Sequence, residues 1–307
     1  MNATTEPAPD RLALAAFAGA VLIGGSNFVA IRFSNRELDP LWGAGLRFAV
    51  AAVVFGALCA ALRVSLPRGR PLVLVFAYGL LAFGAAYGCL YWAMQEVPAG
   101  IAAVVLAAGP LLTLLFAVAH GMERLGARAL LGALVAIAGS VVIFFQPGSI
   151  AFGWESFALL ALAALSASES VVVSKLAGRQ HPLAMNFVGM GTGAAVLLIA
   201  AAAAGESFAL PANGETQVAL AYLVAATVGL FLLVLVVVQR WTASATSYIF
   251  VLMPVIAVAL GALVADEPVT ATTVVGGAIV CAGVYVGAAR RGRSTSAPVP
   301  APAGEVV

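Results

Sequence analysis

One acidic residue lies deep inside an apolar stretch of the chain. Glu169 is about 12 residues into the run 156–177, and Ser166 and Ser170 share its face on a helix built from that run. A charged group inside a bilayer costs at least ~2.5 kcal/mol, so its side chain must face a cavity, a partner or a proton. We interpret Glu169 as a substrate-amine contact or proton-coupling residue, or alternatively as a protonated packing residue.

A second polar pair, Ser26 and Asn27, lies at a similar depth in the first apolar run. It follows two glycines, and small residues allow neighbouring helices to approach closely. The pair is therefore either the opposite wall of a central substrate cavity or a site of interhelical hydrogen bonding. Asn186 and Tyr248, each early in a later apolar run, are further cavity candidates.

Aromatic residues gather in the run 71–93. Tyr87 and Tyr91 share one helix face because they are four residues apart. Tyr78 and Tyr87 are candidates for stacking on a planar substrate. Tyr91 and Trp92 lie near the predicted membrane boundary, where such residues commonly anchor a helix at the interface.

Arg47 is about six residues into the run 41–62. Its guanidinium group could bind an anionic substrate group such as a carboxylate. Alternatively, it extends outward to the interface or pairs with Asp39 or Glu37. Of these interpretations we favour a gate, hinge or structural role for Arg47.

Two apolar runs, 98–119 and 243–264, each contain a proline near their middle and are each followed by a glutamate. Pro110 and Pro254 each remove a backbone hydrogen bond and are predicted to kink their helices. Glu123 and Glu267 lie beside short turns, where a carboxylate can accept hydrogen bonds from the first amides of the following helix. We interpret these four residues as hinge, gate or structural elements.

The chain lacks the patterns GxxxxGK[ST], HExxH, GxSxG and CxxC, so no machinery for ATP hydrolysis, zinc proteolysis or serine hydrolysis is visible. The three cysteines lie inside apolar runs and are expected to be small core residues. His120 and His181 fall at predicted helix ends and are interpreted as surface groups. We expect no enzyme activity, no cofactor and no metal site.

The elements that must position these residues are strongly apolar. The 307 residues are 63% hydrophobic and only 9% charged, with a net charge of +2. Soluble domains carry roughly 25% charged residues. So little polar surface excludes a soluble enzyme, a disordered protein and a nucleic-acid binder.

Ten apolar runs divide the chain, and each is long enough at ~1.5 Å per residue to cross a ~30 Å hydrocarbon core. They are residues 12–31, 41–62, 71–93, 98–119, 126–145, 156–177, 183–204, 217–239, 243–264 and 270–289. The first run lacks a basic leader and is expected to be a retained helix. The predicted class is an all-α polytopic membrane protein with ten transmembrane helices.

Lysine and arginine are distributed unevenly between the loops. With ten spans, the loops on the side of the termini collect nearly all of them, whereas the opposite side has only Arg32 and Arg36. Because basic loops remain in the cytoplasm, both termini are predicted to be cytoplasmic, with the protein in the cell (inner) membrane.

The two halves of the chain share the spacing P-x12-E-x8-G-x6-G. A shift of 144 positions aligns Pro110 with Pro254, Glu123 with Glu267, Gly132 with Gly276 and Gly139 with Gly283. Five spans per half is an odd number, so the second half enters the membrane inverted, as is typical of secondary transporters. We expect a cytoplasmic N-terminal tail (1–11), a first repeat (12–145), an inverted second repeat (146–290) and a disordered cytoplasmic tail (291–307).

The chain resembles the EamA-type ten-helix branch of the drug/metabolite transporter superfamily over about residues 11–290. The resemblance depends on Gly24-Gly25-Ser26-Asn27-Phe28, Asp39-Pro40-Leu41, Arg47-Phe48, Pro110…Glu123-Arg124-Leu125 and Pro254…Glu267. The usual Trp before the first glycine–serine is absent, since Ile23 precedes Gly24. Membership implies two inverted five-helix repeats and alternating-access movement of small metabolites, often export.

These observations predict a secondary active transporter that moves a small metabolite by alternating access, most simply exporting an amino acid or a related amphipathic compound. Its expected partners are a small-molecule substrate, the lipid bilayer and protons, but no nucleic acid. An importer of a vitamin or nucleoside-like solute and a small-solute channel are the alternatives. The glycine pairs suit tight helix packing within the chain or across a homodimer.

Overall fold

The computed structural model describes residues 10–122, 127–144, 153–240 and 243–288, which form helices and no strand. The helices are α1 (Arg11–Ser34), α2 (Pro40–Ala61), α3 (Arg70–Gly79), the π-helix η1 (Leu80–Ala85), α4 (Ala86–Ala93), α5 (Ala99–Leu106), α6 (Gly109–Ala119), α7 (Ala127–Phe144), α8 (Trp154–Leu176), α9 (Pro182–Ala204), α10 (Gly214–Arg240), α11 (Ala243–Val264) and α12 (Ala271–Ala288).

Seven stretches in the described part of the chain are long and apolar enough to cross a membrane. They are Arg11–Ser34, Pro40–Ala61, Arg70–Ala93, Ala99–Ala119, Trp154–Leu176, Pro182–Ala204 and Gly214–Val234. Shorter apolar stretches lie in α7, α11 and α12. The all-helical class predicted from the sequence is therefore confirmed, whereas the count of ten spans stays a prediction.

Apolar side chains cover much of the outer surface of the helices. Val53 and Ile199 are each 70% exposed, and Leu263 is 80% exposed. Water-soluble monomers rarely expose apolar residues in such numbers. Lipid is the solvent that suits this surface.

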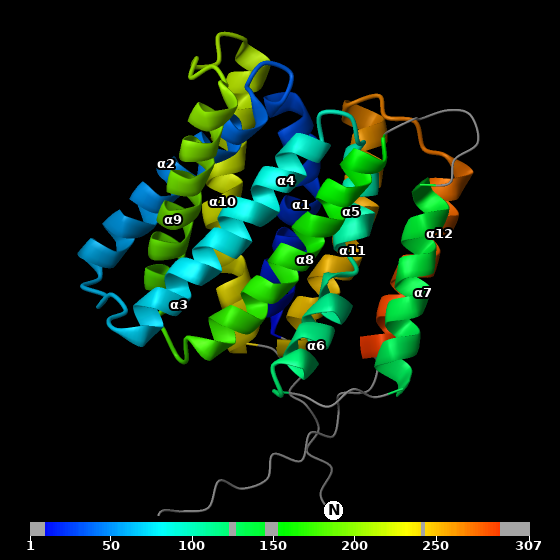
Figure 1. Cartoon of the computed structure of the whole chain (residues 1–307), viewed down its shortest axis with the longest axis horizontal. Coiled ribbons are helices and arrows are strands. Elements are labelled where there is room, and N and C mark those ends of the chain that lie inside the picture. The colour runs from blue at the N-terminus through cyan, green and yellow to red at the C-terminus, as the bar shows by residue number, and fades with distance from the viewer. Residues whose placement is uncertain (1–9, 123–126, 145–152, 241–242, 289–307) are drawn as a thin grey trace, which may run out of the picture.

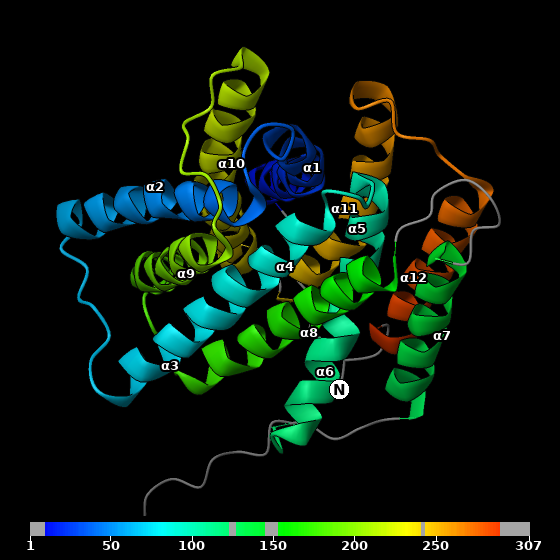
Figure 2. The same ribbon diagram turned by 45° about the horizontal axis from the view of Figure 1, so that its top comes forward.

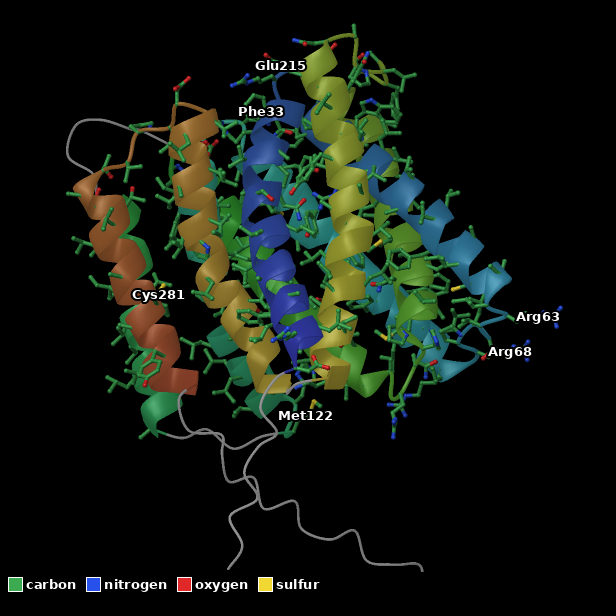
Figure 3. The ribbon with its side chains drawn as sticks, turned by 180° about the vertical axis from the view of Figure 1, so that it is seen from behind. Phe33, Arg63, Arg68, Met122, Glu215 and Cys281 are labelled. Carbon is green, nitrogen blue, oxygen red and sulfur yellow. The ribbon has the colours of Figure 1, made fainter. Side chains whose placement is uncertain are left out.

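The helices form one bundle with α1 near its centre. Contacts join α1 to α10 and α11, and these two helices flank α1 in the view from behind (Figure 3). α2 packs against α9 and α4 against α8, while α7 and α12 pair at one edge (Figures 1 and 2). Arg63 and Arg68 lie toward the end of the bundle that holds Met122, and Glu215 lies at the opposite end (Figure 3).

The two mid-run prolines behave differently. Pro110 lies in the first turn of α6, and the helix is interrupted just before it, at Ala107 and Ala108. The missing N–H of proline and its steric effect on the preceding residue explain the break. Pro254, in contrast, lies inside α11, which continues without interruption. The predicted equivalence of the two prolines therefore does not extend to local structure.

The run 71–93 also departs from a single α-helix, because the wider turns of η1 separate α3 from α4. Phe83, in η1, is 1% exposed and packs against α9. Gly193 of α9 makes room for it, since a Cβ added at Gly193 would lie 2.3 Å from the Cβ of Phe83. A π-helical turn of this kind is frequent at functional sites.

The repeated glycines hold α7 against α12 within one chain. A Cβ at Gly139 would lie 2.8 Å from the carbonyl oxygen of Gly276, and a Cβ at Gly283 would lie 2.7 Å from that of Gly132. The same pair of contacts thus occurs twice, with the two helices exchanging roles. Tight packing between the runs 126–145 and 270–289 is confirmed as a contact inside the monomer.

Replacing Gly139 by alanine should destabilise the protein by about 1–3 kcal/mol, because the new methyl group meets backbone that cannot rotate away. Thermal unfolding in detergent micelles, followed by size-exclusion chromatography, measures the effect. Gly191→Ala in α9 is the matched control, since a Cβ there meets nothing within 4 Å. Equal unfolding temperatures for the two variants would contradict the close α7–α12 contact.

Candidate functional site

Arg47 lies at the centre of a buried polar cluster contributed by four helices. Its Nε donates to the Thr227 hydroxyl of α10 at 2.7 Å, one Nη to the Tyr91 hydroxyl of α4 at 3.2 Å, and the other to Oδ1 of Asn27 of α1 at 3.3 Å. The exposed fractions are 1% for Arg47 and Thr227, 6% for Asn27 and zero for Tyr91. We call these four residues the Arg47 cluster.

The guanidinium charge in this cluster has neutral hydrogen-bond partners. A guanidinium group has five N–H donors, and three of them are used by the hydroxyl and amide oxygens of the cluster. Among the described residues, no acidic side chain lies within ion-pair distance of Arg47. A buried cation without a counterion is costly. An anion entering the cluster would find a positive charge and two unused donors.

Two predictions about this region were wrong. Arg47 neither extends to the interface nor pairs with Asp39 or Glu37, because its helix directs it into the bundle. Tyr91 is not an interfacial anchor, since it is fully buried with its hydroxyl on Arg47. Trp92, the next residue, is 42% exposed, as expected for an anchor.

An aromatic row leads from α3 to the Arg47 cluster. Tyr78 meets the ring of Phe83 edge-on, and Phe83 stacks on Tyr87 with an interplanar angle of 16°. The rings of Tyr87 and Phe48 both lie 5.2 Å from the guanidinium carbon of Arg47. Such cation–π contacts stabilise the charge without neutralising it. Of the two tyrosine candidates, Tyr87 reaches the cluster, and Tyr78 lies two rings away.

Ser26 and Asn27 point to different neighbours. Asn27 belongs to the Arg47 cluster, whereas the Ser26 hydroxyl bonds to the hydroxyl of Tyr222 in α10 and to its own helix backbone. The sequence did not single out Thr227, and it placed Tyr91 at the membrane interface. The signals available for a shared site were the single threonine in the apolar run 217–239 and a tyrosine four residues after Tyr87.

Glu169 lies beside the end of α6. Its Oε1 is 3.3 Å from Nε2 of His120, the residue that caps α6. His120 is exposed, as expected for a surface group, but its ring also contacts Glu169. No hydrogen bond or ion pair of the described residues joins Glu169 to Asn27, and their placement on two walls of one cavity stays a prediction.

The other polar candidates lie apart from the Arg47 cluster. Ser166 and Ser170 are buried on α8, where the Ser170 hydroxyl donates to the backbone of its own helix, and Asn186 is buried on α9. The side chain of Tyr248 and the whole of Glu123 lie outside the described residues. The described part of the chain contains no group of acidic, histidine or cysteine residues able to hold a metal ion.

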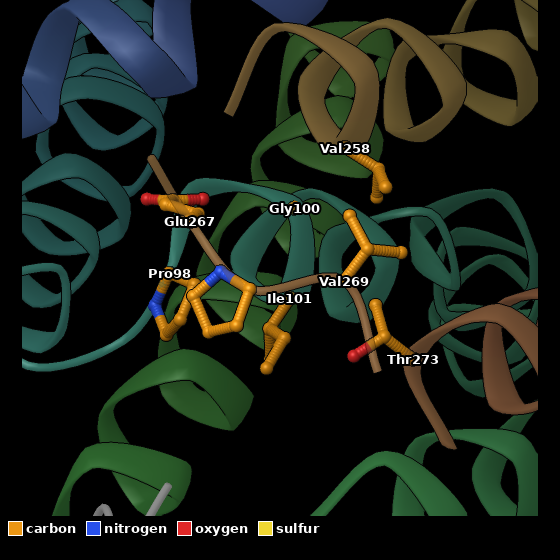
Figure 4. A pocket seen from close by; sticks show the side chains of 8 residues that line it. Pro98, Gly100, Ile101, Val258, Glu267, Val269 and Thr273 are labelled. Carbon is orange, nitrogen blue, oxygen red and sulfur yellow. The ribbon is translucent and has the colours of Figure 1, made fainter. Parts of the chain in front are cut away.

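Glu267 joins three segments near the end of the bundle opposite Met122. Both of its carboxylate oxygens accept from the backbone N–H of Ala99 at 2.9 Å, and Oε1 lies 3.4 Å from Nε of Arg32. Figure 4 shows the carboxylate beside Pro98 at the start of α5. Glu267 therefore caps α5 of the other half of the chain, and not α12, which follows it.

Further carboxylates connect the segment between α1 and α2 to the segment between α9 and α10 by hydrogen bonds. Glu206 accepts from the first amides of α2, at Leu41 and Trp42, and Asp39 accepts from the N–H of Ser207. Glu37 accepts from the N–H groups of Ala212 and Asn213. These bonds connect loops about 170 residues apart in the chain.

The hydrogen bond from the Ala212 N–H, with smaller contributions from Thr216 and Asn213, lowers the pKa of Glu37 below its ordinary value of 4.5. A lowered folded-state pKa stabilises the protein above the unfolded-state pKa, and this stability is lost as the pH falls through the folded-state value. Glu37→Gln should therefore lower the thermal unfolding temperature at neutral pH, with the difference vanishing in acid.

A pH series of thermal unfolding from about pH 7 to about pH 3 measures this difference. Glu215→Gln is the control, because Glu215 forms an exposed ion pair with Arg36 that contributes little. A difference between wild type and Glu37→Gln that persists unchanged in acid would contradict the stabilisation by hydrogen bonds to the Glu37 carboxylate.

The Arg47 cluster is closed off from the surface in this structure. A hollow of about 270 Å³ is apolar and lies between α2, η1, α4, α8 and α9, with Leu41, Trp92 and Leu197 in its wall. It includes none of the four cluster residues. A solute could reach Arg47 only after helices move.

The comparisons with known proteins agree with this architecture. The EamA-like transporter family matches the chain twice, over residues 11–145 and 154–287. A solved crystal structure superposes with a TM-score of 0.64 at 21% identity, covering 89% of this chain and 95% of the other. At that identity the superposition shows a shared fold alone.

Several relatives are named as transporters. The chain is 32% identical over 247 residues to the uncharacterized inner membrane transporter YedA of Escherichia coli (strain K12), covering 78% of each protein. It is 28% identical to a probable terminal-alkyne amino-acid exporter of Streptantibioticus cattleyicolor (87% of this chain, 90% of the relative). It is also 28% identical to a probable amino-acid metabolite efflux pump of Escherichia coli (strain K12), over 87% and 91%. The chain is therefore a multi-pass membrane protein that belongs to the EamA-like transporter family.

Proposed function

We propose that this protein is a secondary active transporter that exports an amino acid or a related amphipathic compound across the inner membrane. The observation that carries the proposal is the Arg47 cluster, a buried guanidinium group held by neutral partners. A substrate carboxylate would supply the missing negative charge and accept hydrogen bonds from the two unused N–H groups of Arg47. Two relatives are named for amino-acid export.

Alternating access is the mechanism that an occluded binding group requires. Arg47 is 1% exposed, so substrate reaches it from one side only when helices separate there, and leaves after the opposite side opens. The aromatic row ending at Tyr87 would pack against the apolar part of the substrate.

The proposed architecture has ten spans, with α7, α11 and α12 added to the seven long stretches. It consists of two inverted repeats, 12–145 and 146–290. The double match to one family and the reciprocal glycine contacts of α7 and α12 support it, since a two-fold axis makes each contact occur twice. The arginines at the end opposite Glu215 support cytoplasmic termini.

Counterflow in proteoliposomes tests the function. The purified protein is reconstituted, and exchange of labelled amino acids, nucleosides and a cationic dye is measured without a gradient. Saturable counterflow of an amino acid is expected. Counterflow of nucleosides alone would overturn the substrate class, and ion conductance without any counterflow would indicate a channel.

A further inference from the structure

His120 and Glu169 meet where the end of α6 lies against α8. Nε2 of His120 lies 3.3 Å from Oε1 of Glu169, and Nδ1 lies 3.0 Å from the carbonyl oxygen of Phe116. The side chains are 36% and 21% exposed, and Oε2 of Glu169 is buried without a hydrogen-bond partner among the described residues. A partly buried carboxylate and an imidazole thus share one contact.

Both contacts of the imidazole ring are satisfied together only with an additional proton. A carbonyl oxygen only accepts, so Nδ1 must carry a proton to bond to Phe116. Nε2 then meets Glu169 either as the N–H of an imidazolium ion or as a lone pair that accepts from a protonated carboxyl group. In either form, the pair holds one proton more than neutral His120 beside ionised Glu169.

Loss of that proton would break one of the two contacts of the imidazole ring. A neutral ring that keeps its Nδ1–H turns a nitrogen lone pair toward the carboxylate at 3.3 Å, and a neutral ring that keeps its Nε2–H loses its bond to Phe116. Either change removes the attraction between opposite charges, which is stronger in an apolar bundle than in water. The proton-bound pair is electrically neutral overall, which is the less costly form in such surroundings.

In the described part of the chain, the titratable groups on the elements packed around His120 and Glu169 form no ion pair with either residue. They are Arg70 and Tyr78 on α3, Tyr87, Cys89 and Tyr91 on α4, Cys281 and Tyr285 on α12, and Glu155 and Lys175 on α8. The side chains of Arg128 on α7 and Tyr248 on α11 lie outside the described residues. Among the described groups, neither Arg70, Glu155 nor Lys175 lies within ion-pair distance of His120 or Glu169.

α6 is a helix of its own. An interruption of the helical backbone precedes it, and the His120–Glu169 pair lies at its other end. The break at Ala107 and Ala108 precedes Pro110, and close to it the Ser168 hydroxyl donates to the carbonyl oxygen of Gly109 at 3.2 Å. The far end of α6 contacts α8 through the side chains of His120 and Glu169. A change at that pair can therefore release the end of α6 while the break absorbs the movement.

We propose that His120 and Glu169 form a proton-binding site that closes the end of α6 on α8. Binding of one proton holds the contact, and release of that proton frees α6. The inference rests on the proposed transport function, in which a proton bound in one conformation and released in the other links solute movement to the proton gradient. It adds His120 to the coupling role predicted for Glu169.

Distances between spin labels test the proposal without a substrate. The labels are attached at M122C and L176C, both exposed sites at the ends of α6 and α8, in full-length protein whose native cysteines are replaced by alanine. The protein is studied in lipid nanodiscs at about pH 5.5 and about pH 8.5. We expect one short distance in acid and an additional longer distance in base.

Two amide variants separate the proton from the contact. Glu169→Gln can donate to the Nε2 lone pair, and His120→Gln can donate to the carboxylate, so neither needs the extra proton. Both variants should keep the short distance at both pH values. His181→Gln, which replaces the other histidine of the chain, should respond to pH as wild type does. Unchanged wild-type distances across this pH range, or a normal pH response in both amide variants, would overturn the proposal.

Flux measurements then connect the site to transport. An imposed pH gradient should accelerate flux of the amino acid found by counterflow in wild type, and this acceleration should be lost in Glu169→Gln. Equal acceleration in both proteins would remove the pair from coupling. Failure of the label experiment leaves the counterflow result standing, and absence of counterflow overturns the transport function whatever the labels show.

Discussion

Replacement of Arg47 by glutamine is expected to reduce counterflow of a carboxylate-bearing substrate by at least about 30-fold. Removing one partner of a buried, hydrogen-bonded charge pair costs ~2–5 kcal/mol, and each ~1.4 kcal/mol is a factor of ten. The loss should appear in substrate affinity, measured from the concentration dependence of counterflow. Arg47→Lys should be intermediate, because lysine keeps the charge but not the planar fork of donors.

Two comparisons separate recognition of an anion from support of the helix bundle. Tyr91→Phe and Thr227→Val each remove one neutral contact to Arg47 and leave its charge, so each should cost no more than about tenfold. The amine formed by removing the carboxylate from the preferred amino acid should bind wild type and Arg47→Gln equally. A correctly folded Arg47→Gln protein with wild-type affinity for the amino acid would overturn the assignment of Arg47 to the substrate.

Replacement of Glu267 by alanine should lower the free energy of unfolding by about 2–4 kcal/mol. The Ala99 N–H would lose both of its charged acceptors, and such hydrogen bonds contribute ~1.5–3 kcal/mol. Arg32 would keep its bonds to the carbonyl oxygens of Met94 and Gln95 but lose its ion pair. Unfolding in mixed micelles with increasing denaturing detergent measures the change.

The effect of Glu267 should depend on its carboxylate more than on its bulk. Glu267→Gln keeps one acceptor oxygen and should be intermediate between wild type and alanine. Glu215→Ala, which removes an exposed carboxylate at the same end of the bundle, should change the free energy by less than about 1 kcal/mol. Equal losses for Glu215→Ala and Glu267→Ala would show that the cap on α5 contributes nothing.

Class and internal repetition follow from composition and spacing alone. Apolar runs of about 20 residues admit helices in a bilayer and little else, because every backbone N–H must find a partner inside its own segment. The spacing of the two halves also aligned Gly132 with Gly276 and Gly139 with Gly283 in sequence. In the structure these four glycines lie where α7 packs against α12. Such inferences succeed because helix length and small-residue spacing are local properties.

The direction in which a polar side chain points within the bundle is not a local property. Ser26 and Asn27 are neighbours in the chain, yet one faces Tyr222 and the other Arg47, since consecutive residues on a helix are ~100° apart. Likewise, Tyr91 and Trp92 look equivalent by composition, but the first is buried and the second exposed. Hydrophobicity gives no direction when every face of a helix is apolar.

The partners of the charged residues were decided by tertiary packing. Arg47 meets Thr227 from 180 positions away, Glu267 caps Ala99 from the opposite half, and His120 reaches Glu169 across the α6–α8 contact. Each pairing depends on how helices of the two halves lie side by side, which residue types and spacing do not specify. Residue types alone identified Glu169 and Arg47 as costly groups that need a partner, because an ionisable side chain in an apolar run must be compensated. Which atoms compensate it is a property of the assembled bundle.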